Sequence, residues 1–265
     1  LRSMGARAVP ALAAFLDNPS APLIHRRRAA RLLGSIPAQA AGDALLARLD
    51  EADLEVASAI MHALEKQRGA DPTLQYSHEP IRHQVARAAR MYLEVRVTLS
   101  CLRGASGGPA TGLLLRTLES RLDRIIQRLF ALLGLRYPPH DIQAAFRAVR
   151  RGTPAELANA AEFLDNILDH DLKRFVLPLL DEDRPPEQIG RELFGLEFHG
   201  PVHALRAILE DGDPWLVVCA MSSAAELGLR ALVPQILAAS VRSAAAAEVA
   251  ARALDRLAPE QEIPT

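Results

Sequence analysis

Apolar residues recur every three to four positions along most of this chain, which is the spacing of one face of an α-helix. A well-marked example is predicted at 213–228, where Asp213 suits a helix cap, Pro214 the first turn and Gly228 the end. Its predicted apolar face consists of Leu216, Cys219, Ala220, Ser223, Ala224 and Leu227. A second amphipathic stretch at 201–211 precedes it, so the two predict a helix, a short turn and a second helix.

The same two-helix pattern returns at both ends of the chain. Further helices of this kind are predicted at 9–17, 22–34, 43–50, 54–64, 229–239 and 241–254. Leu33 and Leu64, at matching places in neighbouring units, lie 31 positions apart. Two-helix units repeated every ~30–45 residues are typical of an α-solenoid, in which no unit can bury its apolar face alone. The sequence therefore predicts an all-α fold, a HEAT-like α-solenoid of stacked helix pairs.

The middle of the chain breaks this repeat. Two long helices are predicted at 78–102 and 113–135, joined by the glycine-rich connector "GASGGPATG". Together they form a long central helical hairpin, and a shorter helix follows at 137–152. Within one continuous solenoid we distinguish N-terminal repeats at 1–68, the hairpin and short helix at 78–152, and C-terminal repeats at 153–257.

The two-helix pattern resumes with helices predicted at 153–168 and 171–181, and the polar stretch "DEDRPPEQ" (181–188) is predicted to be a solvated linker. Several first helices contain a proline, which removes a hydrogen bond and bends a helix. These prolines are Pro10, Pro178 and Pro234.

A proline-bent first helix, an aspartate at the turn and a second helix rich in arginine and alanine together resemble HEAT repeats. The segments "DPWLVVCAMSSAAELG", "VRSAAAAEVAARAL" and "IHRRRAARLLG" match that pattern best. The resemblance covers roughly 1–68 and 153–257, and the motif is degenerate, so it implies the fold alone.

A narrower resemblance rests on the order of "RLFALLGLRYPPHDI", "ANAAEFLDNILDHDLKRFVLPLLD" and "GDPWLVVCAMSSAAELG", across about 125–228. This order looks like the soluble C-terminal HEAT region of bacterial nucleotide-carrier-like membrane proteins, which are related to ATP/ADP translocases. The resemblance implies a cytoplasmic regulatory or scaffolding module at the inner face of the bacterial membrane. It places no nucleotide site in this chain, and membrane association is expected only through segments outside it.

Composition narrows the function classes. The net charge is −1, with 31 basic and 32 acidic residues, and aromatic residues make up 4% of the chain. A nucleic-acid groove needs a basic surface with aromatic side chains for stacking, so no specific nucleic acid is expected as a partner. Cys101 and Cys219 are too few and too far apart for a disulfide framework and are expected to be reduced. No apolar run approaches the ~20 residues that a membrane-spanning helix needs.

The sequence offers little catalytic or metal-binding chemistry. His199 and His203 have the helical spacing of a zinc pair, but a zinc site needs further ligands. His78 and His83 are five positions apart, which places them on different faces of a helix. No grouping typical of nucleophilic catalysis stands out by spacing. We therefore expect no catalytic residue, metal or cofactor, and no enzyme activity.

Arginine clusters are the candidate site residues. They could bind phosphate groups, anionic lipid heads or an acidic partner, and the alternative is a solvated surface with carboxylates nearby. The clusters are Arg26, Arg27 and Arg28; Arg121, Arg124 and Arg128 on one helix face; and Arg147, Arg150 and Arg151.

Repeats without catalytic motifs favour a non-catalytic scaffold that binds a protein partner or another domain of its own polypeptide. Two alternatives stay open. One is a nucleic-acid-binding HEAT protein similar to HEAT-type DNA glycosylases, and the other is a HEAT-like lyase.

Overall fold

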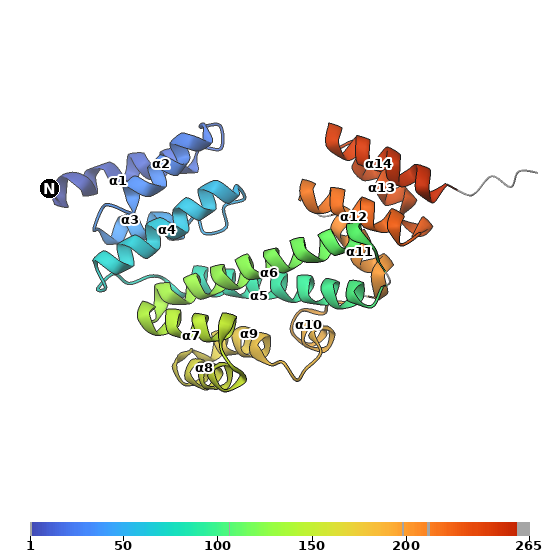
Figure 1. Ribbon diagram of the computed structural model, residues 1–265. Coiled ribbons are helices and arrows are strands. Elements are labelled where there is room, and N and C mark those ends of the chain that lie inside the picture. Colours follow the sequence, from blue (N-terminus) through green and yellow to red (C-terminus); the bar gives the residue numbers. More distant parts are fainter. Residues whose placement is uncertain (1, 106, 198, 211–212, 259–265) are drawn as a thin grey trace, which may run out of the picture. The chain divides into compact units, whose positions relative to one another are not determined.

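The computed structural model describes residues 2–105, 107–197, 199–210 and 213–258. Within these ranges the protein contains fourteen α-helices, one short 3₁₀-helix and no strand (Figure 1). The predicted all-α fold is confirmed. The helices are α1 (Arg2–Asp17), α2 (Leu23–Leu33), α3 (Gln39–Leu46), α4 (Leu54–Ala70), α5 (His78–Arg103), α6 (Pro109–Arg136), α7 (Pro139–Arg151), α8 (Pro154–Ile167), α9 (His170–Leu180), α10 (Pro186–Phe194), α11 (Gly200–Glu210), α12 (Pro214–Glu226), η1 (Arg230–Leu232), α13 (Val233–Ser240) and α14 (Ala244–Leu257).

The chain forms two compact units, each built from separate stretches of sequence. Unit 1 comprises residues 1–89 and 126–181, and unit 2 comprises residues 90–125 and 182–265. Each of the two long helices, α5 and α6, is therefore divided between the two units, with one part in unit 1 and the other in unit 2.

In unit 1, the four N-terminal helices pack as two pairs. α1 contacts α2 and α3, while α4 contacts α2 and α3. Fully buried leucines such as Leu16, Leu33 and Leu45 fill the space between them. Gly34 follows α2, and a Cβ atom on it would lie 2.6 Å from the Cβ of Ala63 on α4. Glycine at this position therefore allows the end of α2 to approach α4 closely.

In unit 2, helices α11 to α14 repeat the same arrangement. α11 contacts α12 and α13, and α14 also contacts both of these helices. Ala220 and Ala224 on α12 are completely buried, so their small side chains permit this close packing. Of the six residues of the predicted apolar face, five are buried as expected, and Leu227, which follows the last residue of α12, is half-buried.

The predicted ends of α12 are also confirmed. The Asp213 side chain accepts hydrogen bonds from the amides of Trp215 and Leu216. Gly228 has a φ of 66°, the left-handed conformation that glycine adopts without strain. The amide of Leu229 then donates to the carbonyl of Ala224, which closes the helix end.

Other expectations need correction. Pro10 and Pro178 lie inside α1 and α9 as predicted. Pro234 does not lie in the middle of a helix. The 3₁₀-helix η1 takes up residues 230–232 and α13 begins at Val233, so Pro234 lies in the first turn of α13. There the missing N–H of proline costs no hydrogen bond.

Several predicted helix boundaries differ from those in the structure, and one helix was missed. The helix predicted at 43–50 is α3, which lies at Gln39–Leu46. The predicted linker at 181–188 contains the start of α10, which begins at Pro186 and ends at the left-handed Gly195. Proline at a first helical position and glycine after the last turn are start and stop signals of a helix, and here they outweigh the polar composition.

Candidate binding cavity

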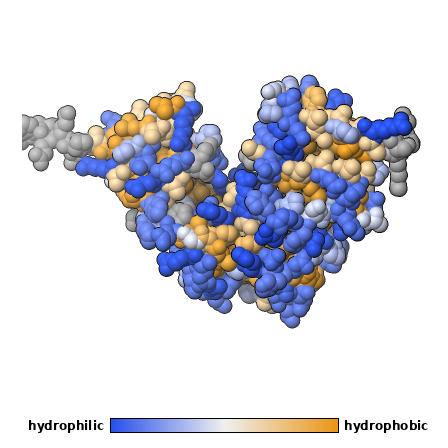
Figure 2. All heavy atoms as spheres, turned by 180° about the vertical axis from the view of Figure 1, so that it is seen from behind, coloured by the Kyte–Doolittle hydropathy of each residue, from blue (hydrophilic) through white to orange (hydrophobic). Residues whose placement is uncertain are grey.

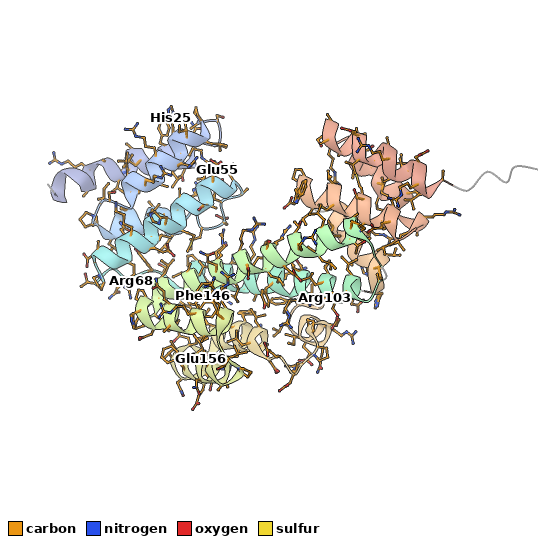
Figure 3. The ribbon with its side chains drawn as sticks, in the orientation of Figure 1. His25, Glu55, Arg68, Arg103, Phe146 and Glu156 are labelled. Atoms are coloured by element: carbon orange, nitrogen blue, oxygen red, sulfur yellow. The ribbon has the colours of Figure 1, made fainter. Side chains whose placement is uncertain are left out.

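A cavity lies inside unit 1, between the C-terminal parts of α4 and α6 and the adjoining α7. Its volume is about 500 Å³, within the ~300–1,000 Å³ of typical ligand pockets. Figure 3 labels Arg68 on α4 and Phe146 on α7, two of the residues that line it.

Apolar side chains form the floor of this cavity. Phe130 on α6 and Ile142 on α7 are buried beneath it. The ring of Phe146 lies 5.3 Å from that of Phe130, centroid to centroid, at an interplanar angle of 42°. Such tilted aromatic pairs are energetically favourable. The floor therefore offers a preformed apolar surface to an occupant.

Two helical glycines line the cavity. At Gly69 on α4 and Gly134 on α6, a Cβ atom would meet no other atom within 4 Å. Neither residue has a positive φ. Glycine in a helix costs about 0.5–1 kcal/mol relative to alanine. Neither close packing nor backbone conformation requires glycine at these positions, and the space they leave open belongs to the cavity.

Charged groups stand at the rim. Partial desolvation raises the pKa of the Glu65 carboxyl, and the nearby His62 partly opposes this shift. The Arg68 guanidinium donates to the carbonyls of Pro72 and Leu74, at 2.9 and 2.8 Å. Arg147 is exposed and has no ion pair or hydrogen bond to another described side chain. The rim thus holds two guanidinium groups and one carboxyl that is poorly stabilised as an anion.

These groups suit binding by apolar contact and charge. Glu65 is the one carboxylate among the described residues that line the cavity, and no serine, threonine, cysteine, histidine or lysine accompanies it there.

The first predicted arginine cluster divides into three different environments. Arg26 is buried and donates to the Leu16 carbonyl at 3.0 Å and to both oxygens of Glu51, at 3.3 and 2.5 Å. Arg27 forms an ion pair with Glu55 at 2.5 Å. Arg28 is exposed and has no described ion-pair partner. Arg26 therefore connects helices within the fold, and Arg28 remains available at the surface.

The second cluster also divides, and each arginine is described within its own unit. In unit 2, Arg121 lies 3.5 Å from Asp213, while Arg124 is exposed. In unit 1, Arg128 donates to the Leu49 carbonyl at 3.0 Å and to the Gln84 side chain at 3.4 Å. Burial and the charge of Arg87 lower the pKa of Arg128.

The third cluster lies on α7 beside the cavity. Arg147 lines the cavity itself. The Arg150 guanidinium lies 5.8 Å from the centroid of the Phe146 ring, a distance typical of a cation–π contact. Arg151 is exposed at the end of α7. Of the nine arginines in the three predicted clusters, Arg147 is the one that lines this cavity.

Sequence reasoning identified Arg147 but missed the cavity beside it. The available signal was a glycine inside the strongly helical stretch "RLFALLGLR", since an isolated glycine in such a pattern often has a packing or functional reason. The residues of α4 that line the cavity lie some 65 positions earlier, and no local pattern in the sequence indicates that they pack near α6 and α7.

The sequence also raised expectations about cysteines, a histidine pair and membrane-spanning helices. Cys101 and Cys219 are free thiols. In the ranges the structure describes, no three metal-binding side chains come together. The rings of His199 and His203 lie 5.9 Å apart, centroid to centroid. None of the described helices is both long and apolar enough to cross a membrane.

Comparisons with protein-family profiles, with curated proteins and with solved structures gave no match to this chain.

Proposed function

We propose that this chain is a non-catalytic protein-interaction module with the architecture of a HEAT-like α-solenoid. The order of helix contacts supports the solenoid. In both α1–α4 and α11–α14, the first helices of consecutive pairs contact each other, and so do the second helices. This is the contact pattern that stacked repeats require.

The cavity between α4, α6 and α7 is the observation that carries the proposed binding function. It combines an apolar floor with a charged rim, and two helical glycines hold it open at a cost in helix stability. Interfaces between proteins are commonly anchored by one large side chain that fills such a pocket.

The chemistry of the rim selects the occupant. Arg147 offers a guanidinium that has no ion-pair partner among the described residues, and the described partners of Arg68 are carbonyl acceptors. A protein segment with a large apolar side chain next to a carboxylate fits this arrangement, because the apolar group would fill the hollow and Arg147 would bind the carboxylate.

Selection from a peptide-display library tests this proposal. The wild-type protein is expected to enrich peptides with an aromatic or large aliphatic residue beside Asp or Glu. Gly134→Leu fills the hollow and should lose these peptides, whereas Ser120→Leu, at an exposed position on the same helix, should retain them. Arg147→Glu should lose the acidic preference while the helical circular dichroism stays unchanged. Equal binding by wild type and Gly134→Leu would contradict the proposal.

We further propose that the module belongs to the cytoplasmic side of a larger bacterial membrane protein of the nucleotide-carrier-like class. The similarity across about 125–228 supports this assignment. An antibody against the chain should detect a band larger than 28.7 kDa in the membrane fraction of the source cells. A soluble band at that mass, with none in the membrane fraction, would contradict it.

A further inference from the structure

The outer surface of α1 and α2 combines positive charge with exposed apolar side chains. Residues 5–35 contain five arginines and one acidic residue, Asp17, which gives this segment a formal charge of +4 in a chain whose net charge is −1. Asp17 is paired with Arg48, and Arg26 and Arg27 are paired with Glu51 and Glu55. Arg7, Arg28 and Arg31 are the arginines of this segment that have no ion-pair partner among the described residues.

Half of the large apolar side chains that the structure shows as exposed lie in the same segment. Ile24 is 68% exposed, and Phe15, Leu23 and Leu32 are 46–47% exposed. Figure 2 shows hydrophobic residues lying beside hydrophilic ones on the molecular surface. Single exposed apolar residues are common, but four in one short segment with a strong positive charge are unusual.

The arrangement on α2 follows helical geometry. The buried face carries Arg26, Ala29, Ala30 and Leu33. On the opposite side, Ile24, Arg28 and Leu32 are spaced four residues apart and Arg31 lies beside them, so they form one exposed stripe. Among the described residues, neither Arg28 nor Arg31 has an ion-pair partner, and α2 contains no acidic residue. The stripe thus alternates apolar side chains with free guanidinium groups.

We propose that the stripe formed by Ile24, Arg28, Arg31 and Leu32 binds an anionic lipid surface. A helix whose exposed face mixes apolar and basic residues can insert its apolar groups between lipid headgroups while its arginines bind the phosphates. The headgroup region of a bilayer offers both apolar and phosphate contacts to the exposed face of a helix, and this binding requires no groove in the protein. Phe15, whose ring lies 6.2 Å from that of His25, would extend the apolar contact from α1. This inference is independent of the cavity.

Co-sedimentation with vesicles tests the inference. The probes are vesicles of phosphatidylcholine containing phosphatidylglycerol, and vesicles of phosphatidylcholine alone. The wild-type chain should sediment with the anionic vesicles and not with the neutral ones, and salt should weaken the binding. Arg28→Ala and Arg31→Ala should each lower the partition coefficient about fivefold, and Ile24→Ser about tenfold.

Two matched variants serve as controls. Arg124→Ala removes an exposed arginine and Val241→Ser an exposed apolar residue (85% exposed) in unit 2. Both should bind vesicles as the wild type does, and circular dichroism should show that every variant is folded.

Three results would overturn the inference. The first is a folded wild-type chain that does not bind anionic vesicles. The second is vesicle binding that the control variants weaken as much as the stripe variants do. The third is an absence of vesicle binding together with either a dimer or a complex with an acidic peptide that Ile24→Ser disrupts, because the stripe would then be a protein interface.

Discussion

At the scale of single residues, three consecutive arginines have three different roles. Arg26 is buried in a two-point ion pair with Glu51, Arg27 pairs with Glu55 at the surface, and Arg28 faces solvent. Helical periodicity distinguishes an inward position from an outward one, but it does not reveal a carboxylate 25 residues away. The sequence could therefore identify the cluster and could not assign its members.

The difference between Arg26 and Arg28 predicts very different mutational effects. Arg26→Ala should destabilise the protein by about 3 kcal/mol, because it removes the cation paired with the largely buried Glu51 carboxylate and the side-chain donor to the Leu16 carbonyl, and leaves the Asp53 amide as the one described donor to Glu51. Arg28→Ala should change stability by less than about 0.5 kcal/mol. Urea unfolding of both variants measures this difference. Equal effects would mean that the Arg26–Glu51 pair contributes nothing.

Other residues of the fold could be predicted well from local sequence. Asp213, Ala220, Ala224 and Gly228 each have a role that depends on neighbours within one helical turn or on helical spacing. The cavity could not be predicted in this way, because it is formed by residues of α4 packed near residues of α6 and α7. The periodicity within one helix does not determine which other helices pack against it.

At the scale of elements, the start of α6 shows how a distant residue sets a helix boundary. The sequence predicts the helix from residue 113, after a glycine-rich connector, but α6 begins at Pro109. The Glu226 carboxylate at the end of α12 accepts hydrogen bonds from the amides of Ala110 and Thr111, at 3.2 and 2.8 Å. The Thr111 hydroxyl also contacts that of Ser223 at 2.9 Å. A residue more than a hundred positions away thus stabilises the first turn.

This capping contact predicts a dependence of stability on pH. Burial alone would raise the pKa of Glu226, but the hydrogen bonds from Thr111, Ala110 and Gly108 outweigh it and lower the pKa below its ordinary 4.5. The stabilisation is therefore present above about pH 4.5 and is lost as the pH falls through the lowered pKa. Glu226→Gln should lower the melting temperature at pH 7 and should melt like the wild type at a pH below both pKa values. A pH-independent difference in melting temperature would contradict this explanation.

The packing of α12 gives a prediction for a helix interface. Ala224 is completely buried where α12 meets its neighbours. Ala224→Leu should overpack this contact and cost about 1–3 kcal/mol. Ala247→Leu, at an exposed position on α14, should change stability by less than about 0.5 kcal/mol. Thermal melts compare the two, and an unchanged melt for Ala224→Leu would show that the interface can readily expand.

At the scale of the whole molecule, the repeated two-helix pattern was enough to predict an all-α chain and most of its helices. Each amphipathic stretch encodes its own apolar face, so the sequence carries this information many times. The division into two compact units has no such repeated signal, because it depends on which parts of α5 and α6 pack with which neighbours. Local sequence patterns therefore predict the individual helices well, but they do not predict how the helices are divided between the two compact units.

The two units contain equivalent helix caps, which allows a test of how independently they contribute to stability. Asp53 caps α4 in unit 1 by accepting from the amides of Glu55 and Val56, and Asp213 caps α12 in unit 2 in the same way. Asp53→Ala and Asp213→Ala should each cost about 1 kcal/mol. Because the two caps belong to separate units and share no described partner, their effects in the double variant should add to within about 0.5 kcal/mol. Urea unfolding of the two single variants and the double variant measures the coupling. A coupling energy above about 1 kcal/mol would show that a change in one unit alters the stability of the other.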